Sequence, residues 1–212
     1  MTARAAKRLA LAWLPFAATL IGIRSRRLTR WELAVSRHVN GLPEGLHRPV
    51  WLVMQAGTLG APMLAGGAAM AAGQPALARR LAGSGLSAYL LAKGVKRIVR
   101  RGRPADLTAG IRIRGRPASG DGYVSGHAAV SMALAAEAAL MLDARARPLP
   151  YTAASVVAVA RLYVGAHLPM DALGGAALGW AISRTASELR RRTAPRLAQP
   201  DSPVATPHLS TH

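Results

Sequence analysis

The stretch Pro49–Ala78, PVWLVMQAGTLGAPMLAGGAAMAAGQPALA, runs for 30 residues without a charged side chain. A helix needs about 20 mostly apolar residues to span the hydrocarbon core of a bilayer. This stretch reaches that length unaided. It also lacks the polar face that a helix of a soluble protein normally shows at every turn. It therefore favours a membrane protein.

Shorter uncharged runs lie on both sides of it, at Leu9–Ile23, Leu81–Ala92, Gly122–Ala136, Pro148–Ala160, Leu162–Met170 and Ala172–Ser183. Each reaches spanning length if it takes in a flanking charge that snorkels or faces a cavity. We expect helices at residues 8–24, 50–73, 77–98, 124–143, 149–166 and 169–186. The predicted fold class is all-α, a polytopic membrane helical bundle with about six transmembrane helices. A soluble all-α protein with very hydrophobic helices is the alternative.

The composition restricts the class of partner. Hydrophobic residues make up 51% of the chain, and the net charge is +19, from 28 basic and 9 acidic residues. The basic residues lie between apolar runs without interleaved aromatic residues, so nucleic-acid binding is disfavoured. Attraction to anionic lipid headgroups explains the charge better. The chain has no Cys, which excludes disulfides, a Cys nucleophile and thiolate metal sites.

Several segments are expected to lie outside the spanning helices. Residues 25–48, with Glu32 and a turn-prone NGLPEG sequence, predict an amphipathic segment at the membrane interface. Residues 99–123 are rich in Gly, Arg and Pro and cannot form a spanning helix. The polar, Pro-containing residues 193–212 predict a disordered tail, which leaves 1–192 as the membrane-embedded domain. The first apolar run resembles a signal peptide but has no convincing cleavage site, so we expect it to remain as the first helix.

Some isolated residues have more than one reading. Gly175 and Gly179 form a GxxxG pair, for which close packing within the bundle is favoured over helix dimerisation. Glu137, inside a predicted helix, is expected to line a polar cavity or to pair with an Arg. The remaining histidines are expected to be chance or interfacial residues; they are His38, His47, His208 and His212.

Three stretches combine fixed charge with histidine: Lys96–Pro104 (KRIVRRGRP), Val124–His127 (VSGH) and Arg161–Asp171 (RLYVGAHLPMD). In a bundle of alternating helices, all three lie at the same membrane face. Arg offers a planar fork for phosphate oxygens and Lys offers a point charge. The stretches together therefore predict a site for a phosphate-bearing anion. The first stretch by itself favours a basic flank of a membrane helix, because Arg97, Arg100 and Arg101 lie there too.

The other two stretches supply groups for chemistry. Ser125 and Gly126 begin a predicted helix, where Ser caps and free N–H groups attract an anion, with His127 at the rim. His167 and Asp171, at i and i+4, are expected on one helical face. There the carboxylate fixes the imidazole tautomer and leaves the other nitrogen as a nucleophile. An ordinary capped helix and a mutually satisfied His–Asp pair are the alternatives.

The ordered set of Lys-x6-Arg-Pro, Ser-Gly-His and Arg-x5-His-x3-Asp resembles the type 2 phosphatidic acid phosphatase (PAP2) family of membrane-bound lipid phosphatases. The spacings agree throughout 96–171. Two positions depart from the usual pattern, which has Pro before Ser-Gly-His and Ser before the later Arg: here these are Val124 and Ala160. The second departure removes a hydroxyl that would be worth about 1 kcal/mol if it bonded to phosphate.

The resemblance implies a metal-independent phosphatase that acts on a lipid phosphate and needs no cofactor. It implies that His167 attacks phosphorus, that Asp171 orients it and that His127 protonates the leaving oxygen. The phosphate oxygens would be held by Lys96, Arg103, Ser125, Gly126 and Arg161. A phosphohistidine then forms and is cleaved by water.

The resemblance also implies an integral, multi-pass protein of a bacterial cell membrane, with an extracytoplasmic active site and membrane lipids as partners. The lipid itself is left open among a polyprenyl diphosphate, phosphatidic acid, phosphatidylglycerol phosphate and a polyprenyl-linked sugar phosphate. A lipid phosphotransferase with the same phosphohistidine is one alternative function. A non-catalytic membrane protein that binds anionic lipids is another.

Overall fold

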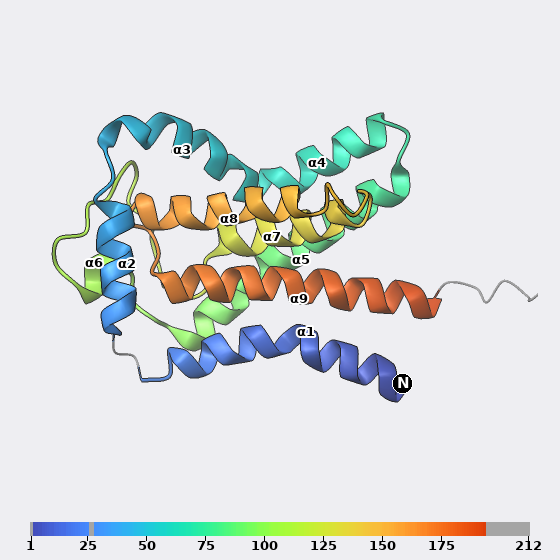
Figure 1. Cartoon of the computed structure of the whole chain (residues 1–212), viewed down its shortest axis with the longest axis horizontal. Helices are drawn as coiled ribbons and strands as arrows, with labels where there is room; N and C mark the ends of the chain where they lie inside the picture. The colour runs from blue at the N-terminus through green and yellow to red at the C-terminus, as the bar shows by residue number, and fades with distance from the viewer. Residues whose placement is uncertain (1, 26–27, 194–212) are drawn as a thin grey trace, which may run out of the picture.

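The computed structural model describes residues 2–25 and 28–193, and every regular element in these ranges is helical. The longest helices are α1 (Ala3–Gly22), α5 (Pro75–Val99), α7 (Gly126–Ala139), α8 (Pro148–Tyr163) and α9 (Pro169–Thr193). The shorter elements are α2 (Arg30–Asn40), α3 (His47–Met54), α4 (Gly60–Ala71) and α6 (Pro104–Leu107), with 3-10 turns η1 (Glu44–Leu46) and η2 (Gln55–Gly57). The long helices lie side by side and α2 runs across their ends (Figure 1). The predicted all-α class is confirmed.

Local signals place the helix starts. Pro75, Pro148 and Pro169 each occupy the first position of a helix, where the missing N–H costs nothing and the fixed φ is already helical. Ser125 caps α7, because its Oγ accepts from the Ala128 N–H at 3.4 Å. These four helices begin within two residues of the predicted positions.

The predicted helix at 50–73 is wrong, because the structure divides it into α3, η2 and α4. At the break, Thr58 adopts an extended backbone with ψ 168°. Gly57 has to lie here: a Cβ on this residue would stand 2.7–2.9 Å from the backbone and Cβ of His127. The helix is therefore interrupted where it meets the start of α7, a contact that hydrophobicity alone does not reveal.

None of the helices found in residues 2–25 and 28–193 combines the length and the apolar character that a membrane span requires. The expectation of about six transmembrane helices stays a prediction. The division into a membrane domain and a tail also stays a prediction. Thr193 ends α9, and the rest of the predicted tail, 194–212, lies outside the described residues.

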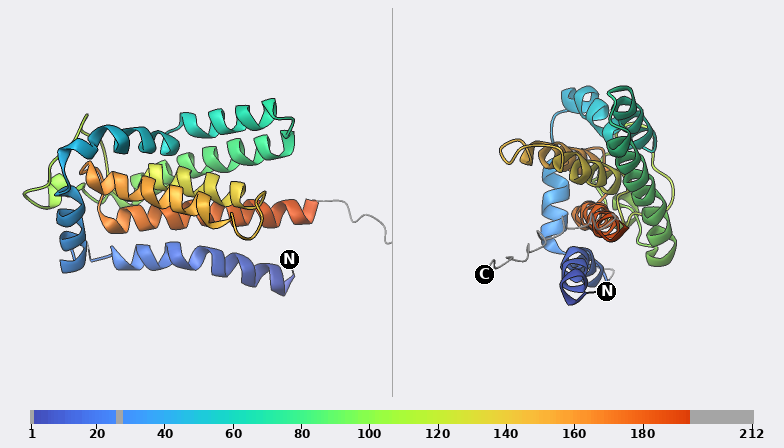
Figure 2. Two further views of the ribbon diagram at one scale, coloured as in Figure 1. Left: turned by 45° about the horizontal axis from the view of Figure 1, so that its top comes forward. Right: turned by 90° about the vertical axis from the view of Figure 1, so that its right-hand side faces the viewer.

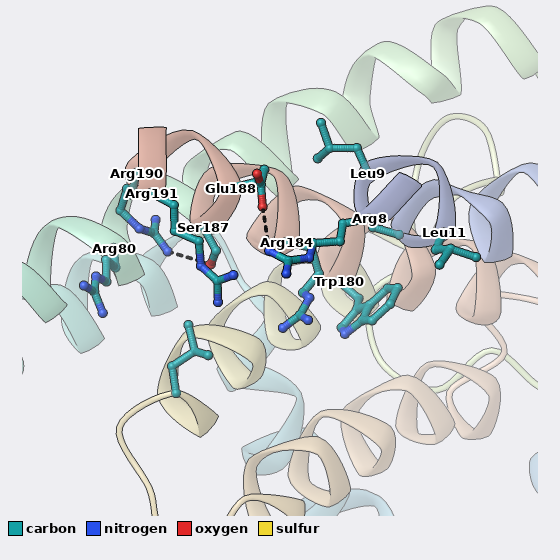
Figure 3. Close-up of a pocket in the computed structure, with 12 residues that line it drawn as sticks. Arg8, Leu9, Leu11, Arg80, Trp180, Arg184, Ser187, Glu188, Arg190 and Arg191 are labelled. Carbon is teal, nitrogen blue, oxygen red and sulfur yellow. Dashed lines mark hydrogen bonds and ion pairs between the residues drawn. The ribbon is translucent and has the colours of Figure 1, made fainter. Parts of the chain in front are cut away.

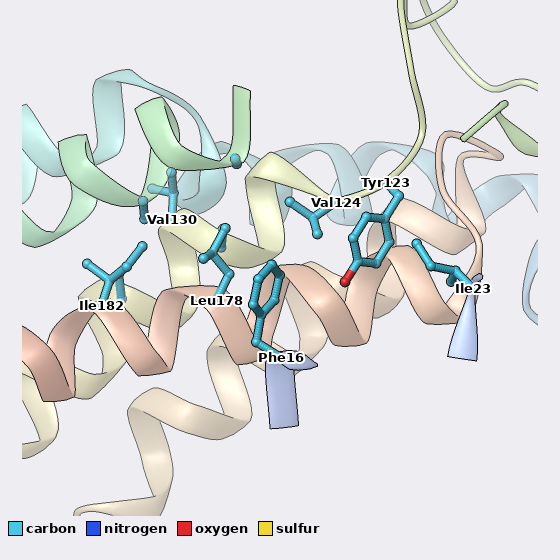
Figure 4. Packing of buried hydrophobic residues seen from close by; sticks show 11 residues of the cluster. Phe16, Ile23, Tyr123, Val124, Val130, Leu178 and Ile182 are labelled. Carbon is cyan, nitrogen blue, oxygen red and sulfur yellow. The ribbon is translucent and has the colours of Figure 1, made fainter. Parts of the chain in front are cut away.

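The core lies where α1, α5, α7 and α9 meet. Figure 4 shows Phe16 of α1 between Tyr123 on one side and Leu178 of α9 on the other, with Ile182 and Val130 beyond Leu178. Small residues bring α7 and α9 together, since a Cβ on Gly179 would collide with the Ala129 carbonyl and one on Gly175 with the Ser125 carbonyl. The GxxxG pair therefore serves packing within the bundle.

One carboxylate is buried in this core. Glu137 of α7 is 0% exposed and accepts from the Oγ atoms of Ser84 and Ser183 at 2.8 and 2.9 Å. Its other oxygen accepts from Arg190 at 2.8 Å. The predicted pairing of Glu137 with an Arg is confirmed, and hydrogen bonds from α5 and α9 offset its desolvation.

Within the predicted interfacial segment, residues 28–48 cross the bundle end instead of continuing a helix (Figure 2). Its helix α2 starts with a capping box between Thr29 and Glu32. At its end, the Asn40 side chain donates to the carbonyls of Arg112 and Tyr163, both at 2.8 Å. These bonds fix α2 and the 99–123 loop against the end of α8. Of that loop only α6, four residues long, is helical, as the Gly, Arg and Pro content predicted.

Candidate active site

The three charged stretches of the sequence meet at one end of the bundle. Lys96 lies in the last turn of α5, Ser125 caps α7 and Arg161 lies in the last turn of α8. Arg103 immediately precedes α6, and Asp171 lies in the first turn of α9. These helix ends gather at the left of Figure 1, beside α2 and α6. The common face expected from alternating helices is thus present in the fold.

A cavity of about 500 Å³ opens at this end, and three of the predicted site residues line it: Arg103, His127 and Arg161. Trp51, Met54 and His47 of the α3 region complete part of its wall. The other predicted residues are not in the wall: they are Lys96, Ser125, Gly126, His167 and Asp171. Ala166 lines the cavity, and the nucleophile predicted from the sequence, His167, is the next residue in the chain.

The cations at the cavity are held in different ways. The Arg103 guanidinium donates to the carbonyls of Ser119, Gly120 and Ala166 at 2.7–2.8 Å, which fixes its plane. Arg161 is 9% exposed. Among the described residues, the only hydrogen-bonding contact of its guanidinium is with the Met54 sulfur at 3.4 Å, and its Nε has no partner. A buried guanidinium with unused donors beside a cavity is suited to an anion.

Lys96 is held by the loop that leads into α7. Its ammonium donates to the carbonyls of Asp121 and Gly122 at 2.6 and 3.1 Å. The next residues form the start of α7, whose first N–H groups have no intrahelical acceptors. A Cβ on Gly126 would meet nothing within 4 Å, so there is open space beside this backbone. The geometry suits the approach of an anion to the helix start.

His167 and Asp171 are close but not paired as the sequence suggested. His167 lies in the connection before α9, so the two residues do not share a helical face. The distance from His167 Nδ1 to Asp171 Oδ2 is 3.7 Å, which is longer than a hydrogen bond, and Nδ1 has no partner. Oδ2 instead accepts from the Leu168 N–H at 2.9 Å. The carboxylate therefore orients the backbone of this connection as well as facing the imidazole.

Burial determines the charge state of His167. The residue is 4% exposed, and burial lowers its pKa to about 4, although the Asp171 carboxylate acts in the opposite direction. The ring is neutral at pH 7 and keeps a nitrogen lone pair, which a nucleophile requires.

Sequence reasoning missed Arg101. Its guanidinium donates to Asp171 Oδ1 at 2.9 Å and to both oxygens of Glu32 at 3.0 Å. Arg101 and Glu32 are at most 3% exposed at their side chains, and Asp171 is fully buried. The Met170 N–H also donates to Glu32, at 3.4 Å. The network ties α2 and the end of α5 to the first turn of α9.

A signal for this network was present in the sequence. Glu32 is one of only nine acidic residues in a chain with 28 basic ones, so an ion pair between Glu32 and a basic residue is to be expected. The Thr-x-x-Glu pattern around Glu32 indicates only a local capping box, and it does not point to the long-range partner Arg101. His47, expected from the sequence to be a chance or interfacial residue, lines the cavity, and its Nδ1 is buried without a partner.

The two departures from the family pattern have different surroundings. Val124 is fully buried in the core cluster between α5, α7 and α9. Ala160 is 3% exposed and packs with Met54, Tyr163 and Val164. In residues 2–25 and 28–193, no group of three or more His, Asp or Glu side chains is arranged to hold a metal ion.

Comparison with known proteins agrees with this geometry. The model of the PAP2 superfamily matches residues 77–193, which contain all three charged stretches. Among curated proteins, none matches the chain in sequence.

Two solved structures share its fold. A transmembrane PAP2 type phosphatidylglycerolphosphate phosphatase from Bacillus subtilis has a TM-score of 0.72 and 17% identity, over 89% of this chain and 98% of its own. LpxE from Aquifex aeolicus has a TM-score of 0.67 and 17% identity, over 74% of this chain and 94% of its own. At this level of identity the likeness establishes the fold.

Proposed function

Since this chain belongs to the PAP2 superfamily, we propose that it is an integral membrane lipid phosphatase that hydrolyses a phosphomonoester or diphosphate of a lipid. The observation that carries the proposal is the convergence of Arg103, His127 and Arg161 on one cavity, whose lining also includes Ala166, the residue before the neutral His167. The family match supplies the reaction class.

The proposed first step is attack by His167. Asp171 faces Nδ1, so Nε2 supplies the lone pair that forms the N–P bond as the bond from phosphorus to the lipid oxygen breaks. His127 acts in its protonated, imidazolium form and gives its proton to that leaving oxygen, which leaves the ring neutral. Charge on the phosphoryl oxygens is stabilised by the cations Lys96, Arg103 and Arg161.

The second step regenerates the enzyme. Water attacks the phosphohistidine while His127 takes a proton from it, the N–P bond breaks and inorganic phosphate leaves. Ser125 and the backbone of Gly126 hold the phosphate at the start of α7 in both steps. The two steps use only these residues and water. The proposed mechanism is therefore metal-independent and uses no cofactor.

A membrane setting for this chemistry is part of the proposal. Large apolar side chains stand exposed on the outer faces of the helices: Leu14 is 61%, Leu64 is 76% and Leu90 is 56% exposed. Such surfaces are normally covered by lipid or protein. The solved structure with the higher TM-score is described as transmembrane. We place the cavity at the extracytoplasmic face of a bacterial cell membrane.

Phosphate release by purified protein tests the function. In a nonionic detergent with EDTA, the wild type is expected to release phosphate from a lipid phosphate without an added acceptor, and vanadate is expected to inhibit it. His167→Ala and His127→Ala should each abolish release, while His38→Ala should not. Wild-type rates in both active-site variants contradict the assignment. A requirement for an acceptor indicates a phosphotransferase.

A further inference from the structure

A second cationic site lies at the opposite end of the bundle from the candidate active site. It is a cavity of about 500 Å³ between α1, α5 and α9 (Figure 3). Along α9 it is centred about 16 residues from Asp171, which corresponds to about 24 Å of helix. We call it the arginine pocket, and its basic lining residues are Arg8, Arg80, Arg184, Arg190 and Arg191.

Most of this charge has no carboxylate partner. Arg190 pairs with Glu137, and the one acid in the lining, Glu188, lies 3.9 Å from Arg8. Within the described part of the chain, no Asp or Glu pairs with the remaining arginines Arg80, Arg184 and Arg191. The guanidinium groups around this cavity repel each other, and an anion bound between them offsets that repulsion because it attracts each of them.

Two of these arginines are oriented by neutral neighbours. Arg184 lies over the Trp180 ring, with its guanidinium carbon 5.7 Å from the ring centroid. Arg80 contacts the Met141 sulfur at 3.9 Å. Neither contact uses the full set of guanidinium donors, so both side chains keep N–H groups for a planar, multidentate acceptor such as a phosphate.

Apart from Ser187 and Glu188, the rest of the lining is apolar or aromatic. Leu9, Leu11 and Ala12 of α1 contribute to it, as does Leu140 at the end of α7. Leu11 is 55% and Leu140 43% exposed. A lining that combines arginines with leucines suits an amphiphile, whose phosphate contacts the guanidinium groups while the upper part of a hydrocarbon chain contacts the leucines. Free phosphate would use only the arginines.

We propose that the arginine pocket binds the phosphate of an anionic phospholipid headgroup, separately from the active site. The volume is in the range of small-ligand pockets, about 300–1,000 Å³. The site does not depend on the chemistry proposed at the other end, and its ligand is a phosphodiester that is bound without reaction.

A matched pair of double variants tests the site. Arg80→Gln with Arg184→Gln removes two cations of the pocket. Arg79→Gln with Arg145→Gln removes two exposed cations at the same end of the bundle that do not line it. Titration calorimetry in an uncharged maltoside measures binding of dioctanoyl phosphatidylglycerol, dioctanoyl phosphatidylcholine and inorganic phosphate.

The wild type and the control pair are expected to bind phosphatidylglycerol equally. The pocket pair should bind it at least about tenfold more weakly, because charge-assisted hydrogen bonds are lost. Phosphatidylcholine and inorganic phosphate should bind the wild type more weakly than phosphatidylglycerol. Phosphate release from a lipid phosphate should be the same in both pairs, which separates failure of this site from failure of the proposed enzyme.

Three results overturn the proposal: affinities of the two pairs within about twofold, phosphatidylcholine binding as tight as phosphatidylglycerol, or inorganic phosphate binding as tight as the lipid. The last would assign the pocket to free phosphate. Unfolding midpoints without lipid verify that both pairs are folded. If the pocket pair is not, the single variant Arg184→Glu, at an exposed position, must reduce phosphatidylglycerol affinity by the same criterion.

Discussion

Arg101 is the residue whose removal most directly tests how the candidate active site is supported. Its guanidinium lies between two buried carboxylates, Glu32 at 3.0 Å and Asp171 at 2.9 Å, with the three side chains at most 3% exposed. Arg101→Met keeps the side-chain length and removes the charge. Two carboxylates then remain buried without their shared cation.

The expected loss of stability is large. Removing one partner of a buried ion pair costs about 3–5 kcal/mol, because the remaining charge is left without compensation. Here a single cation serves both carboxylates, so we expect the upper half of that range. Many domains have only about 5–15 kcal/mol in total, so the variant should fold but with a much reduced margin.

The catalytic effect separates positioning from direct binding. Arg101 does not line the cavity, so KM for a lipid phosphate should change little. Asp171 should move, and the His167 it faces should lose its position, which we expect to lower kcat by about 100-fold. Arg101→Lys keeps the charge without the fork that reaches both carboxylates, and should recover part of both losses.

The assay compares unfolding free energy in a nonionic detergent with kcat and KM measured at a temperature where each variant is folded. Arg97→Met is the matched control, since Arg97 is an exposed arginine of the same helix end and its loss should change stability by less than about 0.5 kcal/mol. If Arg101→Met is as stable as Arg97→Met, or if its kcat equals that of the wild type, the positioning role is refuted.

Three further predictions concern local features of the chain. Arg100 ends α5 with a left-handed backbone, φ 49° and ψ 47°, so Arg100→Gly should raise the unfolding free energy by about 1 kcal/mol, and an unchanged or lower value contradicts this. Gly57→Ala should lower it by about 1–3 kcal/mol and reduce phosphate release, because the new methyl meets the backbone of His127. Gly67→Ala, where a Cβ meets nothing within 4 Å, should do neither. The pKa of His167 is about 4 in the folded protein, against the ordinary 6.5. Between these two pH values the unfolded state therefore binds more protons than the folded state. The unfolding free energy should fall as the pH falls through this window, by up to about 3 kcal/mol. His167→Asn should remove that contribution, and an unaltered pH slope refutes the cause.

The sequence predicted the helix starts that are set by residues at the start itself. Pro75, Pro148 and Pro169 open helices by the geometry of the proline ring, and Ser125 opens one by its hydroxyl. It did not predict the break at Gly57, where the surrounding run is as apolar as the helices themselves. That break exists because the backbone of His127 approaches from another helix.

The sequence by itself determined the all-α class, the starts of four helices and the set of residues at one end of the bundle. It did so because apolar length, proline and capping residues act within a few positions of the chain. Only the tertiary structure decided which cations serve the carboxylates and which face the cavity. Arg100 ends α5 with a left-handed backbone, so the residues after it no longer follow the spacing of the helix. Arg101 then donates to Glu32 and Asp171, whereas Arg103 lines the cavity. Both are arginines two positions apart, so only the buried partners brought together by folding distinguish them.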